Sequence, residues 1–321
     1  MQTPEKTIPA APEYESGAAY IDGAFMPVIQ AAIPVLHGGY RRSDVTYDVV
    51  GVWDGNFFRL DDHIARFRAS IRALHMEPAE SDAEIIEILH RLVALAGLRS
   101  AYVSMECLRG APKPGLPRHP ANCRSYLSCH AIPWQSVATH EMFERGMHLM
   151  ISSVLRIPPE SFDPTVKNFH WGDLTRSMFE AKAAGADYSV LLDSDGNITE
   201  GPGFNVFCIR DSVVVCPARG ALKGITQKSV LELCDELGLK SEVRDITAEE
   251  FRNADEIFTC TTAGGVMPAS RIDGRRLNND RPGPISTRLK DLFWSKRTEG
   301  WHASPVRYEL AAKVASCPDP S

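Results

Sequence analysis

The chain has 321 residues, a hydrophobic content of 44%, a charged content of 24% and a formal net charge of −6. These values are ordinary for a globular protein long enough to form two domains. The negative charge, without a run of basic residues, argues against a nucleic-acid-binding surface. No apolar stretch approaches the roughly 20 residues of a membrane span. The eight cysteines show neither a Cys-x-x-Cys pair nor zinc-site spacing, so we expect free thiols, no bound metal and a cytoplasmic location.

The first half of the chain predicts a hairpin, two helices and two further strands. Asp54-Gly55 separates two apolar runs, which is a strong hairpin signal because both turn residues tolerate positive φ. Helices are expected from Asp61 or Asp62, as the cap, to about residue 75 and from Asp82, as the cap, to residue 97. Strands are expected near 101–108 and 124–132. The intervening residues 109–122 contain four prolines and two glycines and predict a loop.

The second half predicts short strands with interspersed helices, which is typical of α/β lobes with mixed sheets. The strands are expected at 147–155, 188–193, 204–209, 212–216, 241–245 and 255–260, and the helices at 173–184, 226–238 and 284–298. We therefore predict an α/β protein of the α+β type with two domains. The predicted division is a disordered leader (1–17), a small α/β domain (18–133), a linker (134–146) and a large α/β domain (147–321).

The most informative pair of residues is Lys167, in a turn rich in apolar side chains, and Glu200, which is followed by Gly201 and Gly203. A lysine amine in an apolar pocket forms a Schiff base readily, and a carboxylate can hold a pyridine nitrogen protonated. Pyridoxal 5′-phosphate (PLP) requires both groups. Each residue alone also fits a plainer interpretation, a solvated lysine and an acidic turn residue.

Two segments could bind a phosphate through backbone N–H groups. Residues 222–226 lead into a predicted helix with Thr226 as its N-cap, and residues 261–265 (Thr-Thr-Ala-Gly-Gly) follow an apolar run. Arg66 could add a bidentate cation. Alone, these segments are an ordinary helix entry and an ordinary turn, and Arg66 could be a solvated side chain.

Several runs of sequence together resemble the class IV (fold type IV) PLP-dependent aminotransferases, over roughly residues 18 to 300. Within that family the chain is most similar to the R-selective amine transaminases. The matching runs are Arg42-Ser43-Asp44-Val45-Thr46-Tyr47-Asp48-Val49, Val52-Trp53-Asp54-Gly55, Phe58-Arg59-Leu60-Asp61-Asp62-His63, Asp163-Pro164-Thr165-Val166-Lys167-Asn168, Trp171-Gly172-Asp173-Leu174, Glu200-Gly201-Pro202-Gly203-Phe204-Asn205, Gly224-Ile225-Thr226 and Thr261-Thr262-Ala263-Gly264-Gly265.

The resemblance implies a role for each matched residue. Lys167 would be the catalytic residue, forming the aldimine with PLP in a ping-pong reaction, and a homodimer with the site near its interface is implied. The implied cofactor-binding residues are Arg66, Lys167, Glu200, Phe204, Asn205, Leu222, Gly224, Ile225, Thr226, Thr261 and Thr262. The implied substrate-binding residues are Arg42, Tyr47, Val49, Tyr102, Ser104, Arg118, Trp171, Thr262 and Ala263.

A transaminase must accept both an amine donor and a keto acid, and a carboxylate needs a cation. Arg118 is the expected cation because its loop could move it in and out, although Arg109 or Lys113 could serve instead. The chain departs from the R-selective group at Arg42, where many members carry histidine, and at Ser104, where some carry glutamate. A second arginine near the entrance could favour carboxylated substrates.

The expected reaction moves an amino group from a primary amine, with R selectivity, to a keto acid such as pyruvate. A D-amino acid transaminase is the first alternative, since Arg118-His119 resembles the carboxylate-binding loop of that group. A branched-chain aminotransferase is a lesser alternative, because that group carries an arginine in the strand that here reads Tyr102-Val103-Ser104-Met105. A lyase acting on aminodeoxychorismate shares the fold, and an inactive binding protein is the remaining option.

Overall fold

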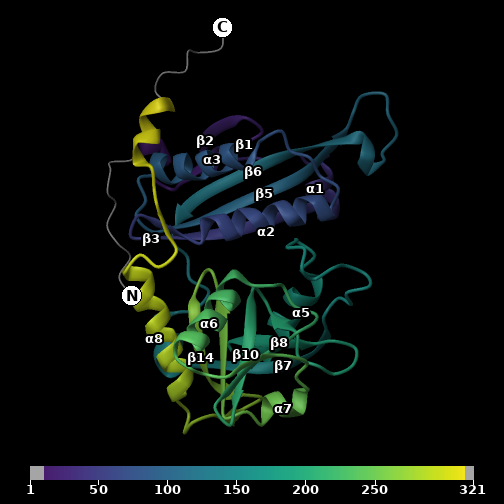
Figure 1. The fold of residues 1–321 in the computed structure, drawn as a ribbon. Coiled ribbons are helices and arrows are strands. Elements are labelled where there is room, and N and C mark those ends of the chain that lie inside the picture. Colours follow the sequence, from purple (N-terminus) through teal and green to yellow (C-terminus); the bar gives the residue numbers. More distant parts are fainter. Residues whose placement is uncertain (1–10, 315–321) are drawn as a thin grey trace. The chain divides into compact units, whose positions relative to one another are not determined.

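The computed structural model describes residues 11–314 of the chain, which divide into two compact units (Figure 1). Unit 1 comprises residues 11–135, 166–169 and 300–314, and unit 2 comprises residues 136–165 and 170–299. The mixed α/β fold expected from the sequence is confirmed. The sequence-based division differs in that it assigned residues 166–169 and 300–314 to the second domain.

Both segments join unit 1 through hydrogen bonds to its sheet. The amide of Tyr47 donates to the carbonyl of Lys167, and Asn168 forms an isolated bridge with Thr46. Residues 303–305 pair with residues 56–58. Of the predicted leader, residues 1–10 lie outside the described residues, and Pro12–Tyr14 forms a short 3₁₀ helix.

Among its described residues, unit 1 contains a seven-stranded antiparallel sheet in the order β16-β4-β3-β5-β6-β1-β2. Helices α2 and α3 pack their apolar sides onto one face of it, around Val50, Phe67, Leu89 and Met105. The elements are β1 (Ala18–Ile21), β2 (Ala24–Pro27), α1 (Gly38–Arg42), β3 (Val45–Trp53), β4 (Asn56–Phe58), α2 (Leu60–Ala73), α3 (Asp82–Leu95), β5 (Ala101–Pro112), β6 (Cys123–Pro133) and β16 (Ala303–Pro305).

The caps of the two long helices differ from the prediction. Helix α2 follows Arg59, whose φ is +54°, and no side chain caps it; Asp61 and Asp62 lie in its first turn instead. Helix α3 is capped by Ser81, which exchanges hydrogen bonds with Glu84 in a capping box. The predicted helices were correct, but neither predicted aspartate cap was.

The predicted loop 109–122 is shorter than expected, because β5 continues to Pro112 and Arg109 pairs with Ser125 on β6. The ladder is irregular between Arg109 and Pro112, so the prolines are accommodated at the end of the hairpin. The remaining loop projects from the end of the sheet (Figure 1).

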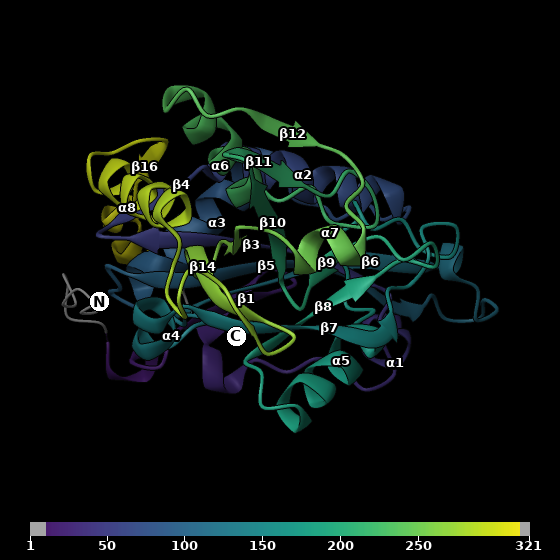
Figure 2. The same cartoon turned by 90° about the horizontal axis from the view of Figure 1, so that it is seen from below.

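Unit 2 contains a nine-stranded mixed sheet among its described residues, with β12 at one end of the main path and β7 and β8 at the other (Figure 2). Its core includes Val206, Phe251 and Ile257. The elements are α4 (His140–Arg145), β7 (Met147–Leu155), α5 (Gly172–Ala183), β8 (Tyr188–Leu192), β9 (Glu200–Gly201), β10 (Phe204–Arg210), β11 (Val213–Cys216), α6 (Ile225–Glu236), β12 (Ser241–Val243), α7 (Ala248–Arg252), β13 (Glu256–Thr261), β14 (Gly265–Ile272), β15 (Arg275–Arg276) and α8 (Pro284–Thr298).

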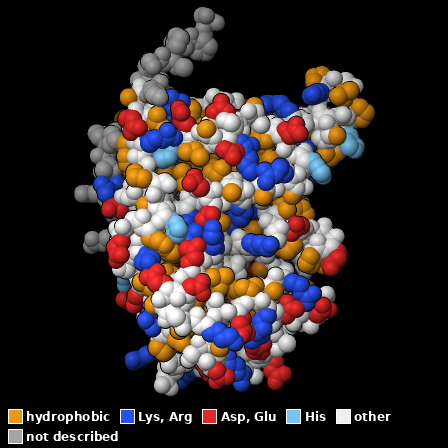
Figure 3. Space-filling view, in the orientation of Figure 1, with side chains coloured by type: hydrophobic (Ala, Val, Ile, Leu, Met, Phe, Trp, Pro, Cys, Tyr) orange, Lys and Arg blue, Asp and Glu red, His pale blue; other side chains and the backbone are white. Residues whose placement is uncertain are grey.

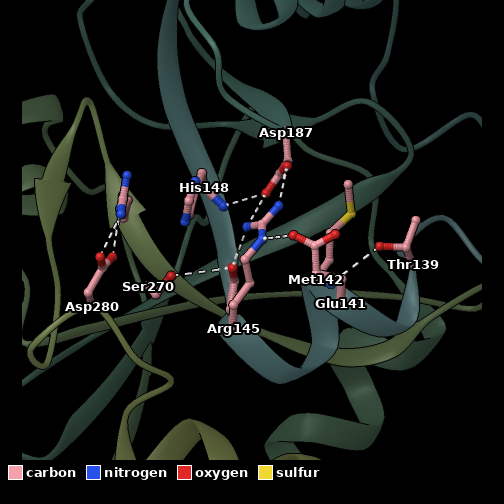
Figure 4. A network of polar contacts seen from close by, with 10 residues as sticks. Thr139, Glu141, Met142, Arg145, His148, Asp187, Ser270 and Asp280 are labelled. Carbon is pink, nitrogen blue, oxygen red and sulfur yellow. Dashed lines mark hydrogen bonds and ion pairs between the residues drawn. The ribbon is translucent and has the colours of Figure 1, made fainter.

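A polar network joins the starts of β7 and β8 in unit 2. The guanidinium of Arg145 and the carboxylate of Asp187 face each other (Figure 4), with N–O distances of 2.7 and 2.8 Å. The same carboxylate accepts from the amide of His148 at 2.7 Å. The network therefore fixes the first residue pairs of the parallel strands β7 and β8.

The surface carries charges of both signs. On the face shown in Figure 3, acidic and basic side chains are interspersed over both units. The seven cysteines within residues 11–314 are free thiols, as expected. In that range no helix has the length and apolarity needed to cross a membrane. The cytoplasmic location stays a prediction.

Candidate active site

Lys167 is held in unit 1 by the first residues of β3 and by α2. Its carbonyl accepts hydrogen bonds from the Thr46 hydroxyl at 2.7 Å and from the Tyr47 amide at 3.2 Å. Its own amide donates to the hydroxyl of Ser70 on α2 at 3.3 Å. Three hydrogen bonds therefore fix the backbone of this one residue, while its side chain stays only partly buried.

The ammonium of Lys167 lies 4.3 Å from the centre of the Tyr47 ring, within the range of a cation–π contact. Phe169 packs against the same ring, with centroids 4.5 Å apart. An aromatic side chain from β3, that of Tyr47, thus covers one side of the amine.

Four of the predicted substrate residues share one face of the unit 1 sheet. Val49 pairs directly with Ser104 across strands β3 and β5, and Gly51 pairs with Tyr102. Because side chains alternate along a strand, Tyr47 and Val49 point to the same face as Tyr102 and Ser104. The Lys167 ammonium lies on this face, because it contacts the Tyr47 ring.

Arg66, on helix α2, is locked into a buried ion pair. Its Nε and Nη2 atoms donate to the two carboxylate oxygens of Asp48 at 2.7 and 2.8 Å. Nδ1 of His63 lies 2.8 Å from the same carboxylate. Burial alone would raise the pKa of Asp48, but the charge and hydrogen bonds of Arg66 and the hydrogen bond to His63 outweigh burial and lower it.

His63 is fully buried beside this pair. Burial lowers its pKa, and the nearby charges of Arg66 and Lys167 lower it further, against the opposite effect of Asp48. The imidazole is therefore neutral at pH 7. Sequence reasoning missed both Asp48 and His63, although both lie in the runs that carry the family resemblance.

The predicted carboxylate-binding residues Arg42 and Arg118 line one hollow of unit 1, together with Arg41 and Arg109. Arg109 is committed to the structure, because it donates to Asp44 at 2.8 Å and to the carbonyls of residues 74 and 75. Arg42 and Arg118 are exposed. The structure thus brings together the two arginines that the sequence singled out, and it gives Arg109 a structural role.

In unit 2, Glu200 is a buried carboxylate held from two sides. Its Oε1 accepts from Nε of Arg156 at 3.1 Å, and its Oε2 accepts from the amide of Leu222 at 3.1 Å. Arg156 also donates to Asp173 at 2.6 Å. The guanidinium of Arg156 thus lies between two carboxylates, those of Glu200 and Asp173. Arg156 was not predicted, because no motif marks it in the sequence.

Asn205 and Gly224 approach each other at the start of helix α6. The side-chain amide of Asn205 donates to the carbonyl of Leu222 at 2.7 Å. A side chain at Gly224 would place its Cβ 1.9 Å from Oδ1 of Asn205, so this position requires glycine. Gly224 is also the N-cap of α6, and Thr226 lies inside the helix with its side chain buried, so its predicted capping role was wrong.

The other predicted residues of unit 2 lie on neighbouring elements. The hydroxyl of Thr261, at the end of β13, donates to the carbonyl of Gly203 at 2.7 Å, and Trp171 approaches Gly203. Ala263 is buried, and Thr262 is partly exposed. The ring of Phe204 is in the core against Tyr188, so its side chain packs within unit 2.

The residues present fit PLP by their chemistry. The first turn of α6 offers backbone N–H groups at Ile225 and Thr226, which lack partners within the helix and suit a phosphate. Glu200 is a buried carboxylate suited to a pyridinium, and Lys167 offers an amine for the aldehyde. Lys167 and Arg66 belong to unit 1, and the other residues of this set belong to unit 2.

Comparisons with known proteins agree on one family. The family model described as amino-transferase class IV matches residues 46–272. The chain is 30% identical over 284 residues to a branched-chain-amino-acid aminotransferase of Pseudomonas aeruginosa, covering 87% of this chain and 92% of that one. It is 28% identical over 272 residues to a D-alanine aminotransferase of Bacillus licheniformis, covering 84% and 93%.

A solved structure gives the same result for the fold. A branched-chain amino acid aminotransferase from T.th., crystallised with pyridoxamine 5′-phosphate, superposes with a TM-score of 0.84 at 29% identity. The alignment covers 91% of this chain and 99% of that one.

Proposed function

The chain belongs to the class IV aminotransferases, and from this premise we propose that it moves the amino group of a primary amine, with R selectivity, to a keto acid such as pyruvate. It is a transaminase, and its cofactor is PLP. When bound, PLP withdraws electrons from the substrate carbon that carries the nitrogen. The finer choice of substrate rests on the residues of this chain.

Lys167 would anchor the cofactor and carry the proton. Its amine would move a proton from the nitrogen-bearing carbon of the donor to the aldehyde carbon of the cofactor, and would move one in the opposite direction when the keto acid reacts. Three hydrogen bonds to the backbone of Lys167 fix the position from which its side chain extends. Glu200, held by Arg156 at 3.1 Å, would lie against the pyridine nitrogen and hold it protonated.

The observation that carries the amine proposal is the composition of the sheet face beside the Lys167 ammonium. This face carries two aromatic side chains, Tyr47 and Tyr102, and two small ones, Val49 and Ser104. Branched-chain aminotransferases carry an arginine in the strand that here reads Tyr102-Val103-Ser104-Met105, so an amino acid donor would not find that carboxylate partner in this strand. A donor amine that carries no carboxylate suits this face better.

The carboxylate of the keto acid requires a cationic partner, and Arg42 and Arg118, which line one hollow of unit 1, are the candidates for it. Arg118 lies in the loop at the end of the β5–β6 hairpin and is exposed, so a rotamer change can redirect it. The same hollow favours a second candidate, a D-amino acid transaminase. The similarity to a D-alanine aminotransferase supports this alternative.

The test compares three donors with a common acceptor, 2-oxobutyrate. We expect a higher kcat/KM for (R)-1-phenylethylamine than for D-alanine, and little activity with (S)-1-phenylethylamine. The reverse order of the first two donors would favour the D-amino acid transaminase. Purified protein that is colourless, takes up no added PLP and converts no donor would favour an inactive binding protein.

We also propose a homodimer. Ile29, Val35, Leu36 and Tyr40 of unit 1 are between 66% and 77% exposed, and a cluster of large apolar side chains this close in sequence suits a subunit interface. Light scattering after size exclusion should give twice the 35.4 kDa mass of the chain. A monomer at micromolar concentration would contradict the proposal.

A further inference from the structure

A polar cluster lies on the same sheet face as the Lys167 ammonium. Glu106 on β5 pairs directly with Tyr47 on β3, and Ser104 lies two residues before it on the same face. On the next strand, β6, Ser128 pairs with Glu106 and His130 pairs with Ser104. We call Ser104, Glu106, Ser128 and His130 the polar wall.

The members of the polar wall are joined by short contacts. The Ser104 hydroxyl donates to Oε1 of Glu106 at 3.1 Å, and Ser128 makes a second side-chain hydrogen bond to this carboxyl group. Nδ1 of His130 lies 3.7 Å from the same oxygen, and Tyr102 stacks on the His130 ring. Within the described part of the chain, His130 is the only basic side chain within ion-pair distance of Glu106.

The polar wall is partly accessible. The side chain of Glu106 is 15% exposed and that of His130 is 28% exposed. Glu106 keeps acceptor capacity beyond its two serine contacts, because a carboxyl group has about four acceptor positions. The serine oxygens keep lone pairs as well. The wall therefore presents an excess of hydrogen-bond acceptors beside the Lys167 amine.

An apolar pair of residues separates the polar wall from the hollow that Arg42 and Arg118 line. Val45 and Leu108, the next pair on the same face beyond Tyr47 and Glu106, form a small apolar cluster with Tyr126. The hollow with Arg42 and Arg118 lies beyond that pair, at the ends of the strands. The acceptor-rich wall near the amine and the cationic hollow at the strand ends are therefore two separate and chemically distinct surfaces of unit 1.

We propose that the polar wall is a specificity determinant for the amine donor, and that it selects donors whose substituent ends in a hydrogen-bond donor, such as an amino alcohol, over hydrocarbon amines of the same size. The inference rests on the proposed function, because it places the substrate on the face beside Lys167. A hydrocarbon group at the wall removes water from Glu106 and returns no hydrogen bond. A donor's carboxylate at the same place brings further acceptors to a surface that already has an excess of them.

The test uses two amines that differ in a single group, (R)-2-aminopropan-1-ol and (R)-sec-butylamine, which have the same handedness in space. We expect the wild-type protein to favour the amino alcohol in kcat/KM by roughly threefold to tenfold, the effect of one net hydrogen bond. The difference should lie mainly in KM, because the hydroxyl binds alike in the ground state and the transition state.

Two variants assign the preference to Glu106. In Glu106→Leu the ratio should fall to about one or invert, and in Glu106→Gln, which keeps an acceptor oxygen, it should stay above that of the leucine variant. The matched control is Glu77→Leu, an exposed residue of the same unit, which should keep the wild-type ratio. The melting temperature and PLP absorbance of each variant show that it is folded and loaded.

A wild-type ratio near one, or a preference that survives in Glu106→Leu, would overturn the inference while leaving the proposed function intact. If the loaded wild-type protein converts neither amine, the proposed function fails and the inference fails with it. A drop in the ratio confined to Glu106→Leu, with Glu77→Leu unchanged, supports the polar wall as the determinant.

Discussion

Replacing Asp48 by asparagine should lower both the stability of unit 1 and the affinity of the protein for PLP. Asp48 is fully buried and pairs with Arg66, whose side chain is only 12% exposed, so water screens this pair very little. Removing one partner of a buried ion pair costs about 3–5 kcal/mol. Asparagine keeps one acceptor oxygen, so we expect the lower end, about 3 kcal/mol.

This loss corresponds to a drop in melting temperature of roughly 6–12 °C, at roughly 2–4 °C per kcal/mol for a domain of this class. The assay is thermal unfolding followed by circular dichroism at pH 7.5. Asp61→Asn is the matched control, because Asp61 is exposed in the first turn of the same helix that carries Arg66. A helix-terminal charge there is worth only about 0.3–1 kcal/mol.

The same variant should bind PLP more weakly, because Arg66, the predicted phosphate-binding cation, loses the carboxylate that holds its guanidinium in place. Titration of the apoprotein with PLP, followed by absorbance, measures this directly. If Asp48→Asn melts within about 2 °C of the Asp61→Asn control, the ion pair adds no net stability. If its PLP affinity also equals that of the control, the positioning role of Asp48 is refuted.

The remaining predictions concern pH, the helix α6 entry and the keto acid. Burial lowers the pKa of His90 to about 4, and its Nδ1 accepts from the amide of Arg307 at 3.1 Å. This folded-state pKa lies below the ordinary value of about 6.5, so neutral His90 contributes fully to stability above pH 6.5, and this contribution is lost as the pH falls to 4. His90→Gln should therefore flatten the curve of unfolding free energy against pH between pH 6.5 and 4. An unchanged slope would contradict the assignment. Gly224→Ala should lower PLP affinity at least about tenfold, since the new Cβ would lie 1.9 Å from Oδ1 of Asn205; a PLP titration that matches wild type would show that the helix entry can relax. Arg118→Ala should slow the keto-acid half-reaction more than the amine half-reaction in single-turnover absorbance measurements, and equal losses in both would exclude its proposed switching role.

Local patterns in the sequence predicted much of the fold. The Asp54-Gly55 hairpin is present, with both residues at positive φ, and helix α8 has the predicted bounds. Strand β14 was missed, although it lies inside the sheet of unit 2. Pro268 interrupts its pattern, and a buried strand without alternation gives no period-two signal.

The site residues that stand in sequence motifs were predicted. The residues that only the tertiary structure brings to the site were missed. Lys167 and Glu200 stand in recognisable runs. Arg156 acts on Glu200 across 44 residues, and nothing local in the sequence marks that contact. Glu106 reads as one polar residue in a strand, and its position opposite Tyr47 appears only once the register is known.

The central claim is that Lys167 is the residue that binds PLP, and borohydride reduction of the yellow holoprotein tests it most directly. Reduction makes the bond between the cofactor and its lysine permanent, and peptide mass spectrometry then locates the label. The label should be on Lys167 alone, with none on Lys223, which lies beside the predicted phosphate site. A label on another lysine, or an unlabelled Lys167 in protein that has retained its cofactor, would contradict the account.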